Sequence, residues 1–379
     1  MKKTIFGLSL FILFVFISSG QALPRFALQK GLKCISCHIN PTGGAERNSY
    51  GTMMFGRNEL PVPAHEPTTE FNSNLTDQLV LGADIRMQFL YNGDQKNHAF
   101  QAMQGGLYLT AYLNSHTSLF TKFDFTNLDF EAYGLFSFWS NKFILKAGSF
   151  LPAYGIRLDD HTSYTRGGNL GYLTGLPPRG LIFYPNYREV GIEGTAYLGK
   201  SITLNLAFTN GFKPALNASG TSVNNRPIPY NFIKKETMIA RAEYFSKISS
   251  ANFFCGGSYY NGLDHLQIFG GFVGANWDRF TLLSELDRAE MLPGLPKADV
   301  RLIQLDYLVS QGFYATLRYD YLDPVGSDPL TRYVIGAEYF PYSYIEIRPQ
   351  YRLNRVPGST NPSNMVQISD LVLQLHIWF

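Results

Sequence analysis

The sequence predicts an all-β fold, a transmembrane antiparallel β-barrel of about sixteen strands that follows a small N-terminal segment. Charged residues make up 16% of the 379 residues and aromatic residues 15%, whereas a soluble domain carries about 25% charged residues. Beyond the first 22 residues, no apolar run approaches the roughly 20 residues that a membrane helix needs. From about Leu79 onward, apolar and polar residues alternate in many short stretches. Together these features are typical of bacterial outer-membrane barrels.

The beginning of the chain predicts a secretory signal peptide. Lys2 and Lys3 precede an apolar run from Ile5 to Ile17, and small or polar residues lead to a cleavage site after Ala22. The apolar run is too short to cross a bilayer core of about 30 Å as a helix. The mature protein is therefore expected outside the cytoplasm. The chain divides into a signal peptide (1–22), an N-terminal segment (23–70) and a barrel (71–379).

The N-terminal segment contains the sequence Lys33-Cys34-Ile35-Ser36-Cys37-His38. C-x-x-C-H is the attachment signature of a c-type haem. Each thiol forms a thioether to one vinyl group of the porphyrin, and the histidine supplies an axial nitrogen to the iron. The motif predicts one covalent haem c, held by Cys34 and Cys37 and ligated by His38. Because the segment is too short to bury a core alone, we expect the porphyrin and the barrel wall to supply apolar contacts.

Two other interpretations of the cysteines are open. In an exported protein Cys34 and Cys37 could form a disulfide, although a disulfide leaves His38 unexplained. A zinc site needs more ligands at suitable spacing, and neither His65 nor His98 provides that spacing. The remaining cysteine, Cys255, lies in a predicted strand, where we expect it to pack as a small apolar residue.

The sixth ligand of the haem iron is less well defined. Met53 and Met54 are nearest in sequence, followed by His65 and His98, and a thioether ligand would raise the redox potential. Alternatively, these methionines pack against the haem or the barrel wall, and the ligand is absent or comes from the lumen. Residues 46–60 predict a short helix that ends at Pro61, because proline cannot continue a helix.

Period-two alternation predicts each strand of the barrel. For example, Ile202, Leu204, Leu206 and Phe208 share one face, which would meet lipid. The predicted strands have approximate centres at residues 85, 108, 121, 134, 145, 191, 206, 241, 256, 271, 284, 303, 317, 336, 348 and 373. The last of these strands ends at a C-terminal phenylalanine, Phe379, which resembles the recognition signal of proteins that are inserted into the outer membrane.

The connections alternate between short turns and longer loops, as in bacterial barrels. Short turns are predicted around Ser115, Ser140, Gly199, Ile248, Asp278, Gln311 and Pro341. Longer loops are predicted near 92–102, 151–186, 211–234, 290–296, 323–330 and 355–366, with tight connections near Asn127 and Asp264. An even number of strands places both ends of the barrel on the short-turn, periplasmic side.

The longest loop, 151–186, has two interpretations. In porins a long loop often folds into the lumen and narrows it. Asp159, Asp160 and His161 could then meet ferrous iron, but the sequence favours a solvated loop with hydrogen-bonding side chains. Mixed charges on the opposite face of the strands predict a hydrated or filled lumen: Lys122, Asp124, Arg241, Glu243, Glu285, Asp287, Arg318, Asp320, Glu346, Arg348 and Arg352.

The combination resembles the outer-membrane fused monohaem cytochrome–porins of the iron-oxidising type. The residues that carry the resemblance are Phe26, Ala27, Gly31, Cys34, Cys37, His38, Pro41, Asn48, Gly51 and Phe55, followed by the barrel. The resemblance implies that the haem segment acts as a plug in the lumen and conducts electrons across the outer membrane. It also implies an extracellular donor such as Fe(II) and a periplasmic c-type cytochrome as acceptor, or another electron carrier.

The competing function is a solute- or anion-selective porin whose N-terminal segment is a haem or disulfide appendage. Electron transfer requires no general acid, base or nucleophile, so we expect no catalytic residues even if the protein oxidises Fe(II). The net charge of +3 is too small to indicate a nucleic-acid partner. Outer-membrane lipid is the partner that the barrel itself predicts.

Overall fold

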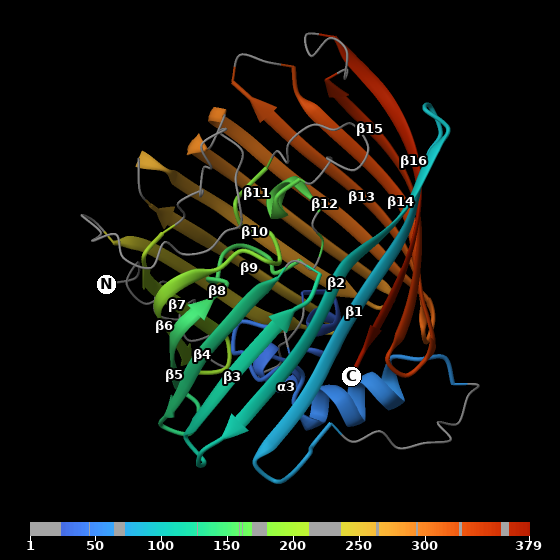
Figure 1. Ribbon diagram of the computed structural model, residues 1–379. Coiled ribbons are helices and arrows are strands. Elements are labelled where there is room, and N and C mark those ends of the chain that lie inside the picture. The colour runs from blue at the N-terminus through green and yellow to red at the C-terminus, as the bar shows by residue number, and fades with distance from the viewer. Residues whose placement is uncertain are drawn as a thin grey trace, which may run out of the picture.

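The computed structural model describes residues 24–44, 46–63, 73–126, 128–158, 160, 162–168, 180–211, 236–262, 265–292, 295–325, 328–357 and 364–379. Within these ranges the chain forms one closed barrel of sixteen antiparallel strands, which confirms the predicted architecture (Figure 1). Neighbouring strands in the sequence are neighbours in the barrel, and β16 pairs with β1 to close it.

The strands match the predicted centres. Their bounds are β1 Leu79–Asn92, β2 Asn97–Tyr112, β3 Thr117–Asp124, β4 Asp129–Phe138, β5 Phe143–Phe150, β6 Glu189–Leu198, β7 Ile202–Thr209, β8 Thr237–Ile248, β9 Ala251–Asn261, β10 Gln267–Trp277, β11 Phe280–Leu292, β12 Leu295–Ser310, β13 Phe313–Pro324, β14 Leu330–Tyr342, β15 Ile345–Pro357 and β16 Met365–Trp378. In the described ranges, no helix is long and apolar enough to cross a membrane.

The alternation of the strands separates an apolar outer face from a polar inner face. On β7 the side chains of Ile202, Leu204, Leu206 and Phe208 are 38–45% exposed on the outside, whereas Asn205 is buried in the interior. The lumen-facing charges that the pattern predicted on β3, β11, β13 and β15 are largely buried inside the barrel. The outer belt is therefore the surface that contacts lipid. Cys255 is exposed on this outer surface and is not packed in a core.

Two of the predicted loops are wrong. Residues 97–102 belong to β2, and only four residues separate β1 from β2. Likewise, β11 ends at Leu292 and β12 begins at Leu295, so most of 290–296 is strand. Residues 97–100 are exposed on both faces, because the strands project beyond the lipid-facing belt at this rim. Without a buried face there is no alternation, and the pattern cannot reveal the strand.

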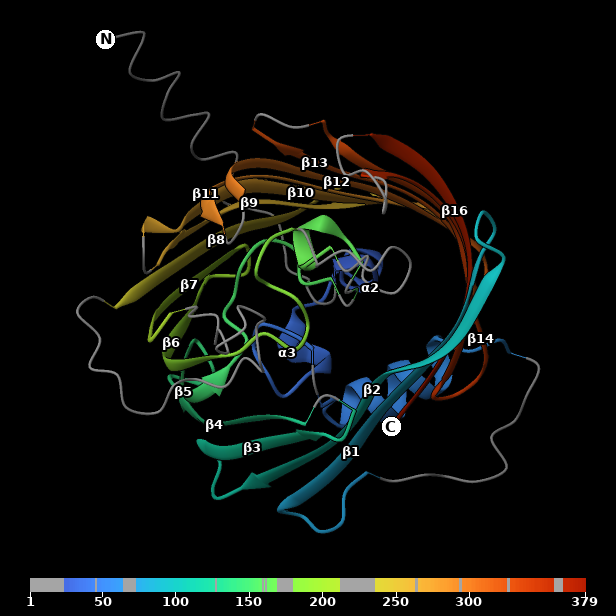
Figure 2. The ribbon, with the colours of Figure 1, turned by 45° about the horizontal axis from the view of Figure 1, so that its top comes forward.

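The described part of the N-terminal segment, residues 24–44 and 46–63, lies inside the barrel, at the end where the connections are short turns (Figure 2). It contains the helices α2 (Pro24–Lys30) and α3 (Cys34–Cys37) and the π-helix η1 (Tyr50–Glu59). Gln311, in a short turn, donates hydrogen bonds to the carbonyl oxygens of Asn58 and Pro61, at 3.1 and 2.9 Å. This end of the barrel is the one that the strand count assigned to the periplasm.

The barrel wall supplies the apolar contacts that the segment cannot supply itself. Leu28, on α2, is fully buried and belongs to a cluster with Phe254 and Phe272. Ile39 packs in a second cluster, with aromatic side chains of β2, β3 and β4. Phe55 and Leu60 belong to a third cluster, which is made with β13, β14 and β16. The predicted dependence of this segment on the wall is confirmed.

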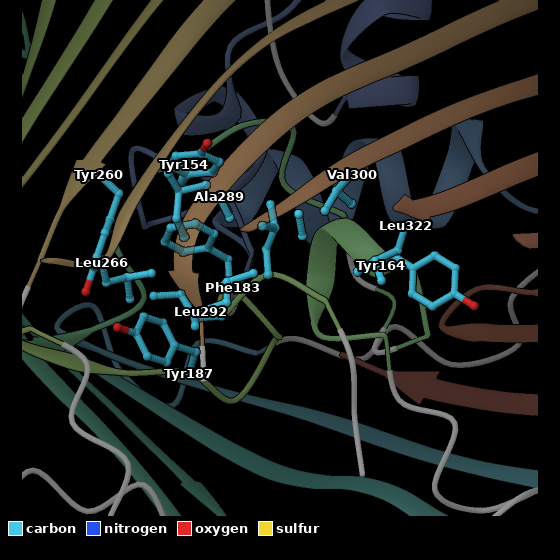
Figure 3. Close-up of a cluster of buried hydrophobic side chains, with 14 of the residues drawn as sticks. Tyr154, Tyr164, Phe183, Tyr187, Tyr260, Leu266, Ala289, Leu292, Val300 and Leu322 are labelled. Atoms are coloured by element: carbon cyan, nitrogen blue, oxygen red, sulfur yellow. The ribbon is translucent and has the colours of Figure 1, made fainter. Parts of the chain in front are cut away.

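Residues 151–188 connect β5 to β6, and we call them the lumen loop. The described residues of this loop (151–158, 160, 162–168 and 180–188) fold into the barrel. Tyr154 stacks on Phe183, with 4.1 Å between ring centroids, and Tyr187 lies in the same buried cluster (Figure 3). Arg166 forms a buried ion pair with Glu285 on β11, at 2.9 Å. The described part of the loop is thus a packed element that narrows the lumen, and the solvated interpretation is wrong for it.

The free-energy cost of a charged side chain on the outer face depends on how deep in the bilayer it lies. We expect Leu206→Arg, midway along β7, to destabilise the barrel by about 2–4 kcal/mol, and Leu198→Arg, beside a short turn, by about 0–1 kcal/mol. Both leucines are exposed on the outer face, at 45% and 52%. Urea titrations in lipid vesicles, followed by gel mobility, measure the two free energies of unfolding. Equal costs would contradict the assignment of the lipid-facing belt.

Candidate functional site

The C-x-x-C-H motif forms one short helix inside the lumen. The backbone N–H of His38 donates to the carbonyl oxygen of Cys34, at 2.9 Å, and ends α3. Cys37 and His38 are buried, Cys34 is partly buried, and both thiols are free. Burial raises the pKa of the Cys34 thiol to about 12 and that of Cys37 to about 11, so both thiols are neutral at physiological pH. No disulfide joins them in the structure.

Asn48 holds η1 against the motif helix. Its backbone N–H donates to the carbonyl oxygen of Cys37, at 3.0 Å, and its side-chain amide donates to that of Ile35, at 2.9 Å. Its side-chain oxygen accepts a hydrogen bond from the N–H of Gly51, also at 3.0 Å. A Cβ atom at Gly51 would overlap the carbonyl oxygen of Cys37, so only glycine allows this approach.

A cavity of about 220 Å³ lies beside His38, between the N-terminal segment, the lumen loop and the barrel wall. Its apolar lining includes Phe26, Leu60, Phe340 and Trp378, and the rest of the lining is rich in arginine and carboxylate side chains. A smaller hollow of about 80 Å³ lies beside Cys34. The lumen loop contributes lining residues that the two spaces share, namely Leu151, Arg157 and Leu158.

This arrangement fits a covalent haem c. The two free thiols are three positions apart on one helix, and a buried imidazole follows directly. The adjoining spaces offer apolar side chains to a macrocycle and cationic side chains to its carboxylates. Two thiols and one imidazole are also the donor set that the chemistry of haem attachment requires.

The described candidates for the sixth ligand, Met53, Met54 and His98, do not line the cavity beside His38. Met53 is partly buried and Met54 is 51% exposed on η1. His65 lies outside the described residues. His98 is exposed near the turn between β1 and β2, at the opposite end of the barrel from His38. The identity of the sixth ligand stays a prediction.

Of the three residues predicted to meet ferrous iron in the lumen loop, the structure describes only Asp160. Asp159 and His161 lie outside the described residues. Asp160 pairs with Arg318, on β13, instead of facing open solvent. Burial raises the pKa of Asp160 and the ion pair lowers it. The Arg318 guanidinium prevails and holds this pKa well below its ordinary value. Within the described residues, no group of three or more His, Cys, Asp or Glu side chains is arranged so that it could hold a metal ion.

Sequence reasoning missed one histidine in the cavity. His376, on β16, lies between two carboxylates, with 2.9 Å from Nδ1 to Glu346 and 3.1 Å from Nε2 to Asp84. All three residues line the cavity beside His38. Period-two alternation from Gln374 to Trp378 could have placed His376 on the inner face. Nothing in the sequence, however, indicated that β1 and β15 would present carboxylates to it.

No protein-family model matches the chain, and no curated protein matches it by sequence. Solved structures do match it. OprB of Pseudomonas putida is 9% identical with a TM-score of 0.57, and covers 80% of this chain and 94% of its own. OmpF of Salmonella typhi is 12% identical with a TM-score of 0.53, and covers 79% and 97%. The outer membrane channel DcaP of Acinetobacter baumannii is 14% identical with a TM-score of 0.51, and covers 82% and 100%.

The fold is that of outer-membrane porins. Sequence identities of 9–14% are evidence for a shared fold and not for a shared function. Together with the apolar outer belt and the closed ring of strands, this fold places the protein in the bacterial outer membrane, as the sequence predicted. The wall of the barrel accordingly contacts membrane lipid.

The contact between η1 and the motif helix gives a direct test of the site. We expect Gly51→Ala to loosen the N-terminal segment, because the added Cβ overlaps the Cys37 carbonyl oxygen. Limited proteolysis of the folded barrel should cut the segment at least several times faster in this variant. Met54→Ala, on the exposed side of the same helix, is the control and should leave the rate unchanged. Identical rates in both variants would contradict the packing of η1 on α3.

Proposed function

We propose that this protein carries electrons across the outer membrane through one covalently attached haem c. Cys34 and Cys37 would hold the haem by thioethers, and His38 would ligate the iron. The observation that supports this most strongly is position. A haem-attachment motif lies buried inside the lumen of a closed barrel, beside a cavity and against the barrel wall.

The chain supplies the surroundings that such a conduit needs. A bilayer insulates soluble carriers from one another, and a closed barrel opens a path while its backbone groups stay paired. The N-terminal segment and the lumen loop occupy that path, which restricts water and solutes. Phe26, Leu60 and Trp378 provide an apolar lining that favours burial of a macrocycle. A haem c, when bound, cycles between ferric and ferrous iron and so accepts and releases one electron at a time.

The partners follow from the two sides of the membrane. We propose an extracellular donor such as Fe(II), which the cytochrome–porin resemblance implies, and a periplasmic c-type cytochrome as acceptor. The motif lies near the short-turn end of the barrel, which would bring a periplasmic carrier close to it. The alternative is transfer in the reverse direction, from the periplasm to the outside. The stopped-flow experiment described below decides between the two directions.

The cysteines provide the decisive test of the cofactor. We expect Cys34→Ala combined with Cys37→Ala to abolish the haem stain on a denaturing gel, because only a covalent haem survives denaturation. The barrel should still insert, because its strands begin at Leu79. His38→Ala should keep thioether-linked haem but change its reduced-minus-oxidised spectrum. A wild-type protein without haem stain would refute the proposal.

Stopped-flow mixing with ferrous iron then tests the donor. Prompt appearance of the reduced c-type spectrum in outer-membrane fractions would support inward transfer from Fe(II). If the spectrum ignores Fe(II) and responds only to a periplasmic donor, the direction we propose is wrong.

A solute porin is the second candidate, and the comparisons favour it more directly. Every structure reported above has a porin-type fold, and one further match is titled an anion-selective porin from Comamonas acidovorans, at 10% identity and a TM-score of 0.50. The arginine-rich lining of the lumen is also compatible with an anion path.

Ion conductance separates the two functions. We expect wild-type protein in planar bilayers to pass far less current than a variant that lacks residues 24–63, because that segment packs across the lumen. An ordinary porin would conduct well with the segment in place, and its deletion would change little. Retained barrel mobility on a gel shows that the deletion variant has folded.

A further inference from the structure

The arginines of the cavity fall into two groups. Seven arginines line the cavity beside His38. Arg25, Arg86, Arg188, Arg318 and Arg348 each pair with at least one carboxylate of the described chain. Arg47 and Arg157 have no carboxylate within salt-bridge distance among the described residues. An interior guanidinium without a counter-charge is costly, so these two positions suggest an anion that the described residues do not provide.

Arg157 reaches the motif from the lumen loop. Its guanidinium rests on Gly44, where an added Cβ would lie 2.7 Å from both Nε and Nη2. Gly44 also has a φ of +71°, which favours glycine. The Nη1 atom of Arg157 is buried and makes no hydrogen bond within the described chain. Because Arg157 lines both the cavity beside His38 and the hollow beside Cys34, it lies where those two spaces adjoin.

Arg47 approaches from the N-terminal segment itself. A β-bridge joins its backbone to that of His38, so the two residues are held side by side. Its guanidinium carbon lies 4.9 Å from the centroid of the Trp378 ring, which orients the charge without neutralising it. Burial lowers the pKa of Arg47, although an arginine stays protonated. Two cations from different elements thus adjoin the motif.

We propose that Arg47 and Arg157 bind the two carboxylates of the haem, its propionates, at this site. This inference rests on the proposed function. Arginine suits the task because its planar guanidinium donates two parallel hydrogen bonds to a carboxylate. The arrangement gives the lumen loop a second role, since Arg157 would fasten to the cofactor a loop that Arg166 fastens to the wall. It also gives the Pro41–Gly44 turn a purpose, because Gly44 makes room for that guanidinium.

The redox potential is the appropriate readout. A cation beside the haem stabilises the reduced state more than the oxidised state, because reduction adds negative charge. The haem is covalent, so removing a cation leaves it attached and measurable. We expect Arg157→Gln and Arg47→Gln each to lower the midpoint potential of the haem in purified outer membranes. Gly44→Ala should lower it as well, because it displaces Arg157 without changing any charge.

The controls separate this effect from a general change of charge or fold. Arg288→Gln removes one positive charge on the outer surface, where Arg288 pairs with Asp299, and should leave the potential unchanged. Arg157→Lys keeps the charge but not the paired geometry, and should shift the potential less than Arg157→Gln. Gel mobility confirms that each variant has formed a barrel.

The outcomes distinguish the inference from the function it rests on. If wild-type protein carries no haem, the proposed function fails first. If haem is present and neither arginine variant nor Gly44→Ala moves the potential, the assignment of Arg47 and Arg157 is overturned. Free anions could occupy the same cations, so the wild-type potential is also titrated with phosphate and acetate. A shift that phosphate or acetate produces in wild type, and that Arg157→Gln abolishes, would assign the site to a free anion and overturn the propionate assignment.

Discussion

A lipid bilayer offers no hydrogen-bond partner to a backbone amide, and this constraint determines the form of the chain. β16 pairs with β1 from Asp84 to Asn92, and Phe379 exchanges two backbone hydrogen bonds with Ala83. Every strand thereby has a neighbour on each side. A ring of sixteen strands also encloses space, so its interior either stays open to water or must be filled by other parts of the same chain.

The charges on the inner wall determine how that interior is filled. A carboxylate removed from water is stable only when a cation or several donors reach it. Arg25, at the start of the N-terminal segment, reaches Asp306 and Glu338, and Arg166, in the lumen loop, reaches Glu285. The wall therefore provides docking points for both inner elements, and apolar clusters around Leu28 and Phe55 complete their attachment.

The barrel could be predicted from the sequence, whereas the packing of its interior could not. Alternation along β7 and β13 is a local signal that follows from one face in lipid, so strand count and orientation were predictable. It failed at the start of β2, where residues 97–100 are exposed on both faces. The position of the haem-attachment motif inside the lumen followed from resemblance alone. The meeting of His376 with Asp84 and Glu346, and of Arg157 with Gly44, depends on segments far apart in sequence.

We propose that this barrel passes electrons and excludes ions. The most direct measurement uses sealed vesicles that contain the protein in the membrane and an oxidised soluble c-type cytochrome inside, with ferrous iron outside. We predict that the entrapped cytochrome is reduced while the vesicles retain an entrapped ion indicator, and that the double substitution of Cys34 and Cys37 by alanine stops the reduction. The opposite result, in which vesicles with the wild-type protein leak ions and the entrapped cytochrome stays oxidised, would contradict this proposal.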